Sequence, residues 1–141
     1  MERLTKVMDK YLKKAVADWD KKKVLTLVVS KEWFDMIVAG RKTEEYREIK
    51  AYWVRRIFDM SRAKVGADTI SLALQHDIIR DRKDIFKECA KKFTHVLFIN
   101  GYRKDSPRIE KEIESITIGK PREGLCPEEW LDTEFFIIKF K

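Results

Sequence analysis

The sequence contains few residues that bind metals or form cross-links. Its 141 residues include two cysteines and two histidines, and neither Cys89 nor Cys126 belongs to a CxxC pair. With only His76 and His95 to complete a ligand set, the sequence offers no tetrahedral metal site. We therefore expect no metal, no cofactor and two free thiols in a reducing compartment.

Glycine, proline and long apolar runs are also scarce. There are five glycines and three prolines, whereas hydrophobic residues make up 44% and charged residues 39% of the chain. This composition indicates one soluble globular domain and excludes a disordered or fibrous protein. No segment reaches the roughly 18 apolar residues of a membrane span, and the N-terminus lacks a signal-peptide core. We expect a cytoplasmic protein with no membrane partner.

The charge of the chain is distributed unevenly. The net charge is +7, yet residues 120–134 carry two basic and five acidic side chains. A basic balance attracts polyanions and therefore favours a nucleic acid as the partner. The acidic segment offers a different kind of surface, which is better suited to a protein partner.

The pattern of apolar residues predicts about five strands with helices between them. Apolar and β-branched runs predict strands at residues 24–29, 43–49, 94–100 and 135–140, and a fifth strand at the end of 109–118. Helices are predicted at residues 31–39, which end at a glycine, and at 51–60. Together these elements predict an α+β fold, a small mixed β-barrel with flanking helices.

An amphipathic helix is predicted before the first strand. Residues 2–20 repeat apolar side chains at the spacing of one helical face, among them Val7, Met8, Tyr11 and Leu12. We expect this N-terminal segment, residues 1–22, to pack as a helix on a single domain formed by residues 23–141. A surface helix on a membrane is the less favoured alternative, because acidic residues dilute its positive face.

Residues 61–92 are predicted to be a mostly helical insert. The later part, from residue 84 to 93, has the apolar spacing of a helix. The earlier part is ambiguous, because Ile70, Leu72 and Leu74 alternate as they would in a strand. After Leu74 the sequence continues without a turn sequence into Ile78 and Ile79.

The segment GRKTEEYR, residues 40–47, concentrates charges of both signs between a predicted helix and a predicted strand. Strand side chains alternate between faces, so Thr43, Glu45 and Arg47 should share one face at intervals of roughly 6.5–7 Å. Lys42 lies at the turn, where its ammonium reaches the start of the strand. Glu45 could then bind a base edge while Lys42 and Arg47 bind phosphate. A structural ion pair between Glu45 and Arg47 is the alternative.

The spacing of residues 40–47, after a strand and a helix, resembles the G-x-K-x-x-E-x-R motif of ASCH domains, a family named after a transcriptional coactivator. The resemblance continues in residues 52–53 (YW), in 98–102 (FINGY) and in the closing strand 135–140. It covers most of residues 23–141. It implies a PUA-like β-barrel with a polar cleft, and binding of RNA or of modified nucleotides.

Some small bacterial members of this family are amidohydrolases that act on N4-acetylcytidine. In these relatives the motif lysine and a threonine at the glutamate position supply the base and the nucleophile, with a further acidic residue later in the chain. Here Lys42 matches the lysine, but Glu45 occupies the nucleophile position, and Thr43 lies two residues earlier. A carboxylate lacks the hydroxyl that a base would activate, so we favour binding over catalysis.

Five residues outside the motif complete the predicted ligand site. Tyr52 and Trp53 are expected to stack on a base, although Trp53, on an apolar helix face, is more often a core residue. Asn100, Tyr102 and Arg103 follow a buried strand and are expected at the rim of the cleft. An Asn-Gly pair is, however, also an ordinary turn sequence.

Three functional hypotheses follow. The first is a module that binds RNA or a nucleotide through Lys42, Thr43, Glu45 and Arg47. The second is a hydrolase of a modified nucleoside, with Lys42 as base and Glu45 as general base or activator of water. The third is a protein-interaction adaptor that uses the N-terminal helix or the acidic loop.

Overall fold

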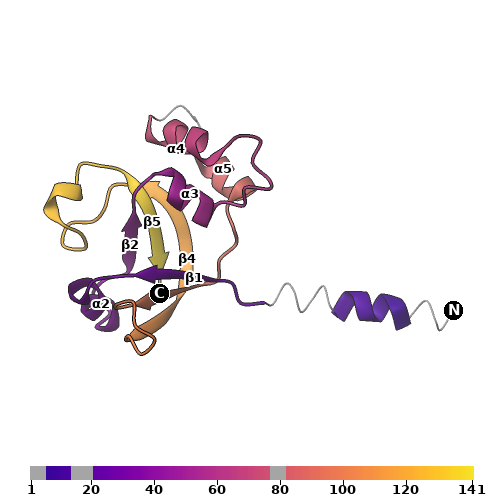
Figure 1. Cartoon of the computed structure of the whole chain (residues 1–141), viewed down its shortest axis with the longest axis horizontal. Helices are drawn as coiled ribbons and strands as arrows, with labels where there is room; N and C mark the ends of the chain where they lie inside the picture. The colour runs from indigo at the N-terminus through magenta and orange to yellow at the C-terminus, as the bar shows by residue number, and fades with distance from the viewer. Residues whose placement is uncertain (1–5, 14–20, 77–81) are drawn as a thin grey trace.

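The structure, a computed structural model, describes residues 6–13, 21–76 and 82–141 (Figure 1). In chain order its elements are β1 (Val24–Val28), α2 (Lys31–Val38), β2 (Glu44–Arg47), α3 (Ala51–Ile57), α4 (Ala67–Gln75), α5 (Arg82–Cys89), β3 (His95–Ile99), β4 (Arg108–Gly119), the 3-10 helix η1 (Glu128–Trp130) and β5 (Phe135–Phe140). The strands form one five-stranded mixed sheet, and helices separate several of them. The predicted α+β class is therefore confirmed.

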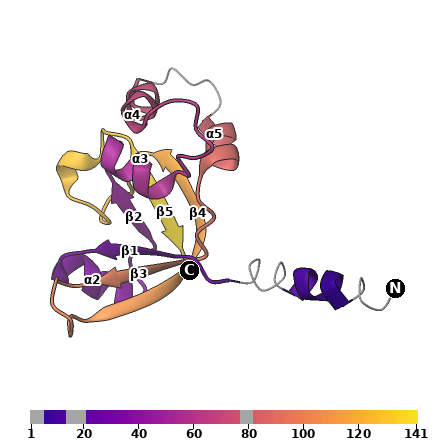
Figure 2. The ribbon, with the colours of Figure 1, turned by 45° about the vertical axis from the view of Figure 1, so that its right-hand side comes forward.

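The sheet has the strand order β1-β3-β4-β5-β2, in which β1 and β3 are parallel and all other neighbours are antiparallel. β4 belongs to both halves of the sheet. Its beginning pairs with β3, and from Ile113 onward it pairs with β5, with an irregularity in the register between Ile113 and Ser115. Bulges bend a strand, and here the curled sheet brings its two edge strands, β1 and β2, close together (Figures 1 and 2).

The curled sheet does not close into the β-barrel that we predicted. Among the described residues, β1 and β2 form no backbone ladder. Arginine side chains bond to β1 carbonyls instead: Arg56 donates to the Thr26 oxygen and Arg47 to the Val28 oxygen, each at 2.9 Å. These guanidinium groups satisfy carbonyls that a closed barrel would have paired with another strand. An opening is left beside Arg47.

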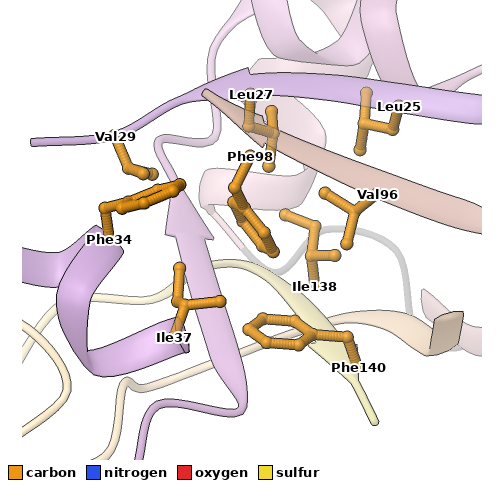
Figure 3. Close-up of a cluster of buried hydrophobic side chains, with 9 residues drawn as sticks. All are labelled: Leu25, Leu27, Val29, Phe34, Ile37, Val96, Phe98, Ile138 and Phe140. Atoms are coloured by element: carbon orange, nitrogen blue, oxygen red, sulfur yellow. The ribbon is translucent and has the colours of Figure 1, made fainter. Parts of the chain in front are cut away.

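The main hydrophobic core lies between the sheet and α2 (Figure 3). Alternation along β1 directs Leu25 and Leu27 inward, and the same period along β5 directs Ile138 and Phe140 toward them. α2 contributes two side chains that lie one turn apart. The buried members are Leu25, Leu27, Val29, Phe34, Ile37, Val96, Phe98, Ile138 and Phe140.

A second core lies under α3, α4 and α5, which occupy the same side of the molecule in Figure 1. α4 resolves the ambiguous part of residues 61–92. Ile70 and Leu74 are buried and Leu72 is exposed, which is the four-residue spacing of a helix face and not the two-residue period of a strand. Residues 77–81 of the predicted insert lie outside the described residues.

Residues 6–13 are helical, as their spacing predicts, but all eight are exposed. We expect this segment to pack on the domain, whereas its apolar side chains Val7, Met8, Tyr11 and Leu12 are between 48% and 71% exposed in the described structure. The rest of the predicted helix, residues 2–5 and 14–20, lies outside the described residues. Within the described ranges, no helix is long and apolar enough to cross a membrane.

Candidate functional site

The opening between β1 and β2 contains a small pocket of about 140 Å³. Its walls come from the end of β1, the start of α2, strand β2 and the loop that contains η1. These segments are far apart in the sequence, and the curled sheet brings them together. The lining residues are Val28, Val29, Ser30, Trp33, Lys42, Glu45, Tyr46, Arg47, Leu125, Cys126, Pro127 and Trp130.

The turn after α2 places Lys42 at the base of this pocket. Gly40 adopts a φ of 77°, which favours glycine, and the N–H groups of Arg41 and Lys42 both donate to the Met36 carbonyl, at 2.9 and 3.1 Å. This turn reverses the chain into β2. The Lys42 side chain is only 1% exposed. A glycine-dependent turn therefore fixes the direction of a buried lysine.

Four groups surround the Lys42 ammonium. It donates to the Leu125 carbonyl, and its nitrogen lies 3.6 Å from a Glu45 carboxylate oxygen. It also lies 4.9 Å from the ring centroids of both Trp33 and Tyr46, within the range of a cation–π interaction. A buried charge needs such partners, because each one offsets part of the lost hydration.

Glu45 connects Lys42 to Arg47. One Glu45 oxygen accepts the Tyr46 N–H at 2.9 Å, and the other accepts from Arg47 at 3.2 Å. The same Arg47 nitrogen donates to the Val28 carbonyl of β1. The predicted face shared by Glu45 and Arg47 is thus observed, and both members of the predicted structural ion pair line a pocket.

Burial changes the protonation equilibria in the pocket. It lowers the pKa of Lys42 below its usual value of 10.5, and the Glu45 carboxylate opposes this change. Burial raises the pKa of the Cys126 thiol, against the influence of Lys42. It also raises the pKa of Tyr46 to about 12. The thiol and the phenol are therefore favoured in their neutral forms, and the lysine is easier to deprotonate than a lysine in water.

Aromatic and sulfur-containing side chains complete the pocket, and the sequence did not identify them as site residues. Trp33 comes from α2, and Cys126 and Trp130 come from the loop that we had described only as acidic. Trp130 stacks on Phe135 of β5, with ring centroids 4.9 Å apart and planes 21° apart. More than 80 residues separate Lys42 from Leu125 and Cys126, so no local spacing could reveal this contact.

Some predicted site residues support the pocket from outside. Trp53 does not line it, but its ring centroid lies 5.1 Å from the Arg47 guanidinium carbon, and the ring packs against both hydrophobic cores. Asn100 donates from its side chain to the Val29 carbonyl at 3.0 Å and so supports the β1 wall. Thr43 is also absent from the lining, and its carbonyl accepts the Phe140 N–H at 3.0 Å.

The remaining predicted residues lie on the surface. Tyr52 is half-exposed, and its hydroxyl accepts from Arg56 at 3.1 Å. Tyr102 and Arg103 are exposed in the loop between β3 and β4 and do not line the pocket. Of the residues predicted to share one cleft, Lys42, Glu45 and Arg47 line the small pocket, and the others lie outside it.

On its other side β2 has a second buried carboxylate. Glu44 pairs with Arg122, whose nitrogen lies 2.9 Å from the carboxylate oxygen. The backbone N–H of Arg122 donates to the Tyr46 hydroxyl at 3.1 Å. These contacts fix the start of the acidic loop and hence the position of Cys126 and Trp130 over the pocket.

Within the described part of the chain, no cluster of three or more His, Cys, Asp or Glu side chains is arranged to hold a metal ion. Comparisons of the chain with protein-family models, curated proteins and solved structures found no match.

Proposed function

We propose that the pocket binds a nucleobase, presented by RNA or by a nucleotide. The observation that supports this proposal is that two cations, one carboxylate and three aromatic rings line a single small pocket. Lys42 and Arg47 supply hydrogen-bond donors, and Glu45 supplies an acceptor for an exocyclic amino group. The rings of Trp33, Tyr46 and Trp130 make part of the lining apolar and aromatic, which suits a planar ligand.

The size of the pocket agrees with this ligand class. Pockets for drug-sized ligands occupy roughly 300–1,000 Å³, whereas this pocket occupies about 140 Å³. A single heterocyclic ring therefore suits it better than a whole nucleotide, whose sugar and phosphate would remain outside. The net charge of +7 favours approach of the phosphate groups. We also propose that the curled sheet is an opened form of the PUA-like barrel of ASCH domains, with Arg47 at the point of opening.

The test compares two arginines that have the same structural task. Arg47 and Arg56 both donate to a β1 carbonyl at 2.9 Å and both lie over Trp53, at 5.1 and 5.4 Å, but only Arg47 lines the pocket. Arg47→Ala should weaken binding of fluorescent single-stranded RNA decamers of mixed sequence, and of mononucleotides, by about tenfold or more. Arg56→Ala removes the corresponding contacts with β1 and Trp53 and should leave both affinities unchanged.

Circular dichroism would verify that both variants are folded, and fluorescence anisotropy would measure their affinities. Equal affinities for wild type and Arg47→Ala would refute the pocket as the binding site. Equal losses in the two variants would indicate that general destabilisation, and not a lost ligand contact, causes the effect.

Hydrolysis of a modified nucleoside is a second candidate, and one observation favours it. A general base should have a pKa near the working pH, and burial lowers that of Lys42. A panel of acylated nucleosides incubated with the protein would be analysed for release of the acid. Turnover that disappears in Lys42→Met would establish this activity, whereas no turnover, or turnover that persists in the variant, would refute it.

A protein partner for the N-terminal helix is a third candidate. Val7, Met8, Tyr11 and Leu12 are all exposed on the described helix, and apolar side chains grouped in this way often mark an interface. Deletion of residues 1–22 should leave a folded domain that no longer retains a partner in a pull-down. An aggregated product would instead show that the domain needs this segment to fold.

A further inference from the structure

The loop between β3 and β4 presents an aromatic ring almost entirely to solvent. Tyr102 is 93% exposed. Exposure of an apolar ring to water is unfavourable, so a fully exposed tyrosine in an ordered loop is informative. The loop contributes no side chain to either main hydrophobic core apart from neighbours in the strands.

Hydrogen bonds within the loop hold Tyr102 in this position. The Ser106 hydroxyl accepts the Arg103 N–H at 2.9 Å, and the Ser106 N–H donates to the Arg103 carbonyl at 3.1 Å. The Asn100 N–H donates to the Pro107 carbonyl at 2.8 Å and closes the loop. Gly101 permits the turn with a φ of 119°, a value that other residues rarely adopt. The ring is therefore presented by a constrained turn.

Exposed cations follow Tyr102 in the same loop. Arg103 and Lys104 are both exposed, and within the described structure the side chain of neither forms an ion pair or a hydrogen bond. Arg108 is also exposed, and its guanidinium donates to the Lys104 and Ser106 carbonyls at 3.2 and 3.4 Å. A loop that carries an exposed ring and, next to it in sequence, two exposed cations suits a ligand that has both a flat apolar face and negative charge.

This loop is directly attached to the pocket wall. Val29 lines the pocket, its N–H donates to the Ile99 carbonyl at 3.0 Å, and its own carbonyl accepts from the Asn100 side chain at 3.0 Å. Tyr102 follows two residues after Asn100. In Figure 2, β1 and β3 run in parallel toward the end of the sheet where α2 lies, so the loop and the pocket share that end.

The loop that contains η1 brings the other sign of charge to the pocket. Pro127 and Trp130 line the pocket, and the two residues between them, Glu128 and Glu129, are exposed acids. A phosphate backbone that leaves the pocket is repelled on that side and attracted toward Arg103 and Lys104. The charges thus favour the β3–β4 loop over the η1 loop as the place where an extended anionic ligand continues.

We propose that the ligand is a single-stranded nucleic acid and not a free nucleotide. The pocket holds one base, and residues 101–108 hold a neighbouring nucleotide: Tyr102 stacks on its base, and Arg103 and Lys104 contact phosphate. This inference rests on the proposed base-binding function of the pocket. It adds a second contact that only a ligand longer than one nucleotide reaches.

The test compares ligands of two lengths. Tyr102→Ala should weaken binding of a mixed-sequence single-stranded RNA decamer by about tenfold, because the loss of stacking on one base has an effect of this size. The same change should leave binding of a pool of 5′-mononucleotides unchanged. Tyr102→Phe retains the ring and should bind the decamer like the wild type. Tyr11→Ala removes an exposed tyrosine outside both the pocket and this loop and serves as the control.

Salt dependence tests the cations separately. Replacing both Arg103 and Lys104 with glutamine should reduce the slope of log affinity against log salt by about one to two for the decamer, as expected for one or two lost phosphate contacts. Lys64→Gln, an exposed lysine before α4, should leave the slope unchanged.

Each outcome separates the two proposals. A decamer that does not bind, or that binds Tyr102→Ala and wild type equally, overturns the extended site; mononucleotide binding that depends on Arg47 would still support the pocket. Decamer binding that depends on Tyr102 but not on Arg47 would overturn the base-binding pocket, and with it the inference that the two sites hold one strand.

Discussion

Two lysines near opposite ends of α2 form ion pairs in opposite surroundings. Lys31, in the first turn, lies 2.6 Å from Asp35, and its side chain is 80% exposed. Lys42, after the helix, lies 3.6 Å from Glu45, and its side chain is 1% exposed. The closer pair is the weaker one, because water screens exposed charges and competes for their hydrogen bonds. We therefore expect burial, and not the distance between the charges, to determine how much stability is lost when one partner of each pair is removed.

The buried pair is also the more costly one to maintain. Removing two charges from water carries a penalty that their attraction often fails to repay, and well-packed apolar residues in their place are frequently as stable. Lys42 lies in the wall of a pocket, where it pairs with the Glu45 carboxylate and donates a hydrogen bond to the Leu125 carbonyl. Ionisable groups with a perturbed pKa in a cleft are candidates for a functional site.

The largest effect is expected when the buried pair loses its charge. Glu45→Gln preserves the size of the side chain but leaves Lys42 and Arg47 without their carboxylate. Breaking a buried ion pair from one side costs about 3–5 kcal/mol, so the free energy of unfolding in urea should fall by about that amount. A loss below about 1 kcal/mol would show that the pocket is hydrated enough to screen these charges, and the contrast with Lys31 would disappear.

A smaller effect is expected at the turn that presents Tyr102. Gly101 has a φ of 119°, and a Cβ added there would lie 2.9 Å from the Ser106 hydroxyl oxygen. Gly101→Ala should therefore destabilise the protein by about 1–3 kcal/mol. It should also weaken binding of the RNA decamer without changing mononucleotide binding, because the pocket does not include this loop. Loss of both affinities would show that the loop and the pocket are not independent.

Tyr46 tests burial in the pocket by pH. Its pKa is about 12 in the folded protein and about 10 when unfolded, so the folded state retains a proton that the unfolded state loses between these values. This contribution to stability is complete below pH 10 and is lost as pH rises to about 12. Tyr46→Phe should remove this decrease in the free energy of unfolding with rising pH. Near pH 7 it should cost only about 1 kcal/mol, for the hydrogen bond from the Arg122 N–H.

Unfolding curves measured at intervals between pH 9 and 12 would supply the comparison. The same slope in wild type and in Tyr46→Phe would contradict the assignment, and another group would then have to account for the titration.

Local patterns were enough to predict most of the fold. The strand at Phe135–Phe140 matches its predicted limits, and α2 ends within one residue of its predicted end, because alternation and a C-terminal glycine act over a few residues. α4 was ambiguous because Ile70, Leu72 and Leu74 alternate as they would in a strand, whereas the two that are buried, Ile70 and Leu74, have the four-residue spacing of a helix face. Tertiary packing alone decides which face is buried.

The closure of the sheet and half of the pocket could not be predicted. Whether two edge strands pair depends on what else bonds to their backbone, and here Arg47 and Arg56 supply those bonds across about 20–30 residues of sequence. Trp130 reaches the pocket because the loop before β5 folds back over β2, a contact that leaves no periodic trace. The motif at 40–47 marked one wall of the site, and the fold added the others.

The smallest effect is expected at the exposed pair. Asp35→Asn is the matched counterpart of Glu45→Gln, since each change removes one negative charge and retains the shape of the side chain. Exposed helical pairs four residues apart contribute about 0.3–0.5 kcal/mol, and added salt screens them further. The free energy of unfolding in urea should therefore be lower for Asp35→Asn than for the wild type by no more than about 0.5 kcal/mol in low salt. In about 1 M salt the two free energies should be indistinguishable. Both carboxylates pair with a lysine, so the loss of stability in Glu45→Gln can be divided by the loss in Asp35→Asn. A ratio near one would mean that the type of residue controls the contribution of the pair. A ratio of about six or more would mean that burial controls it.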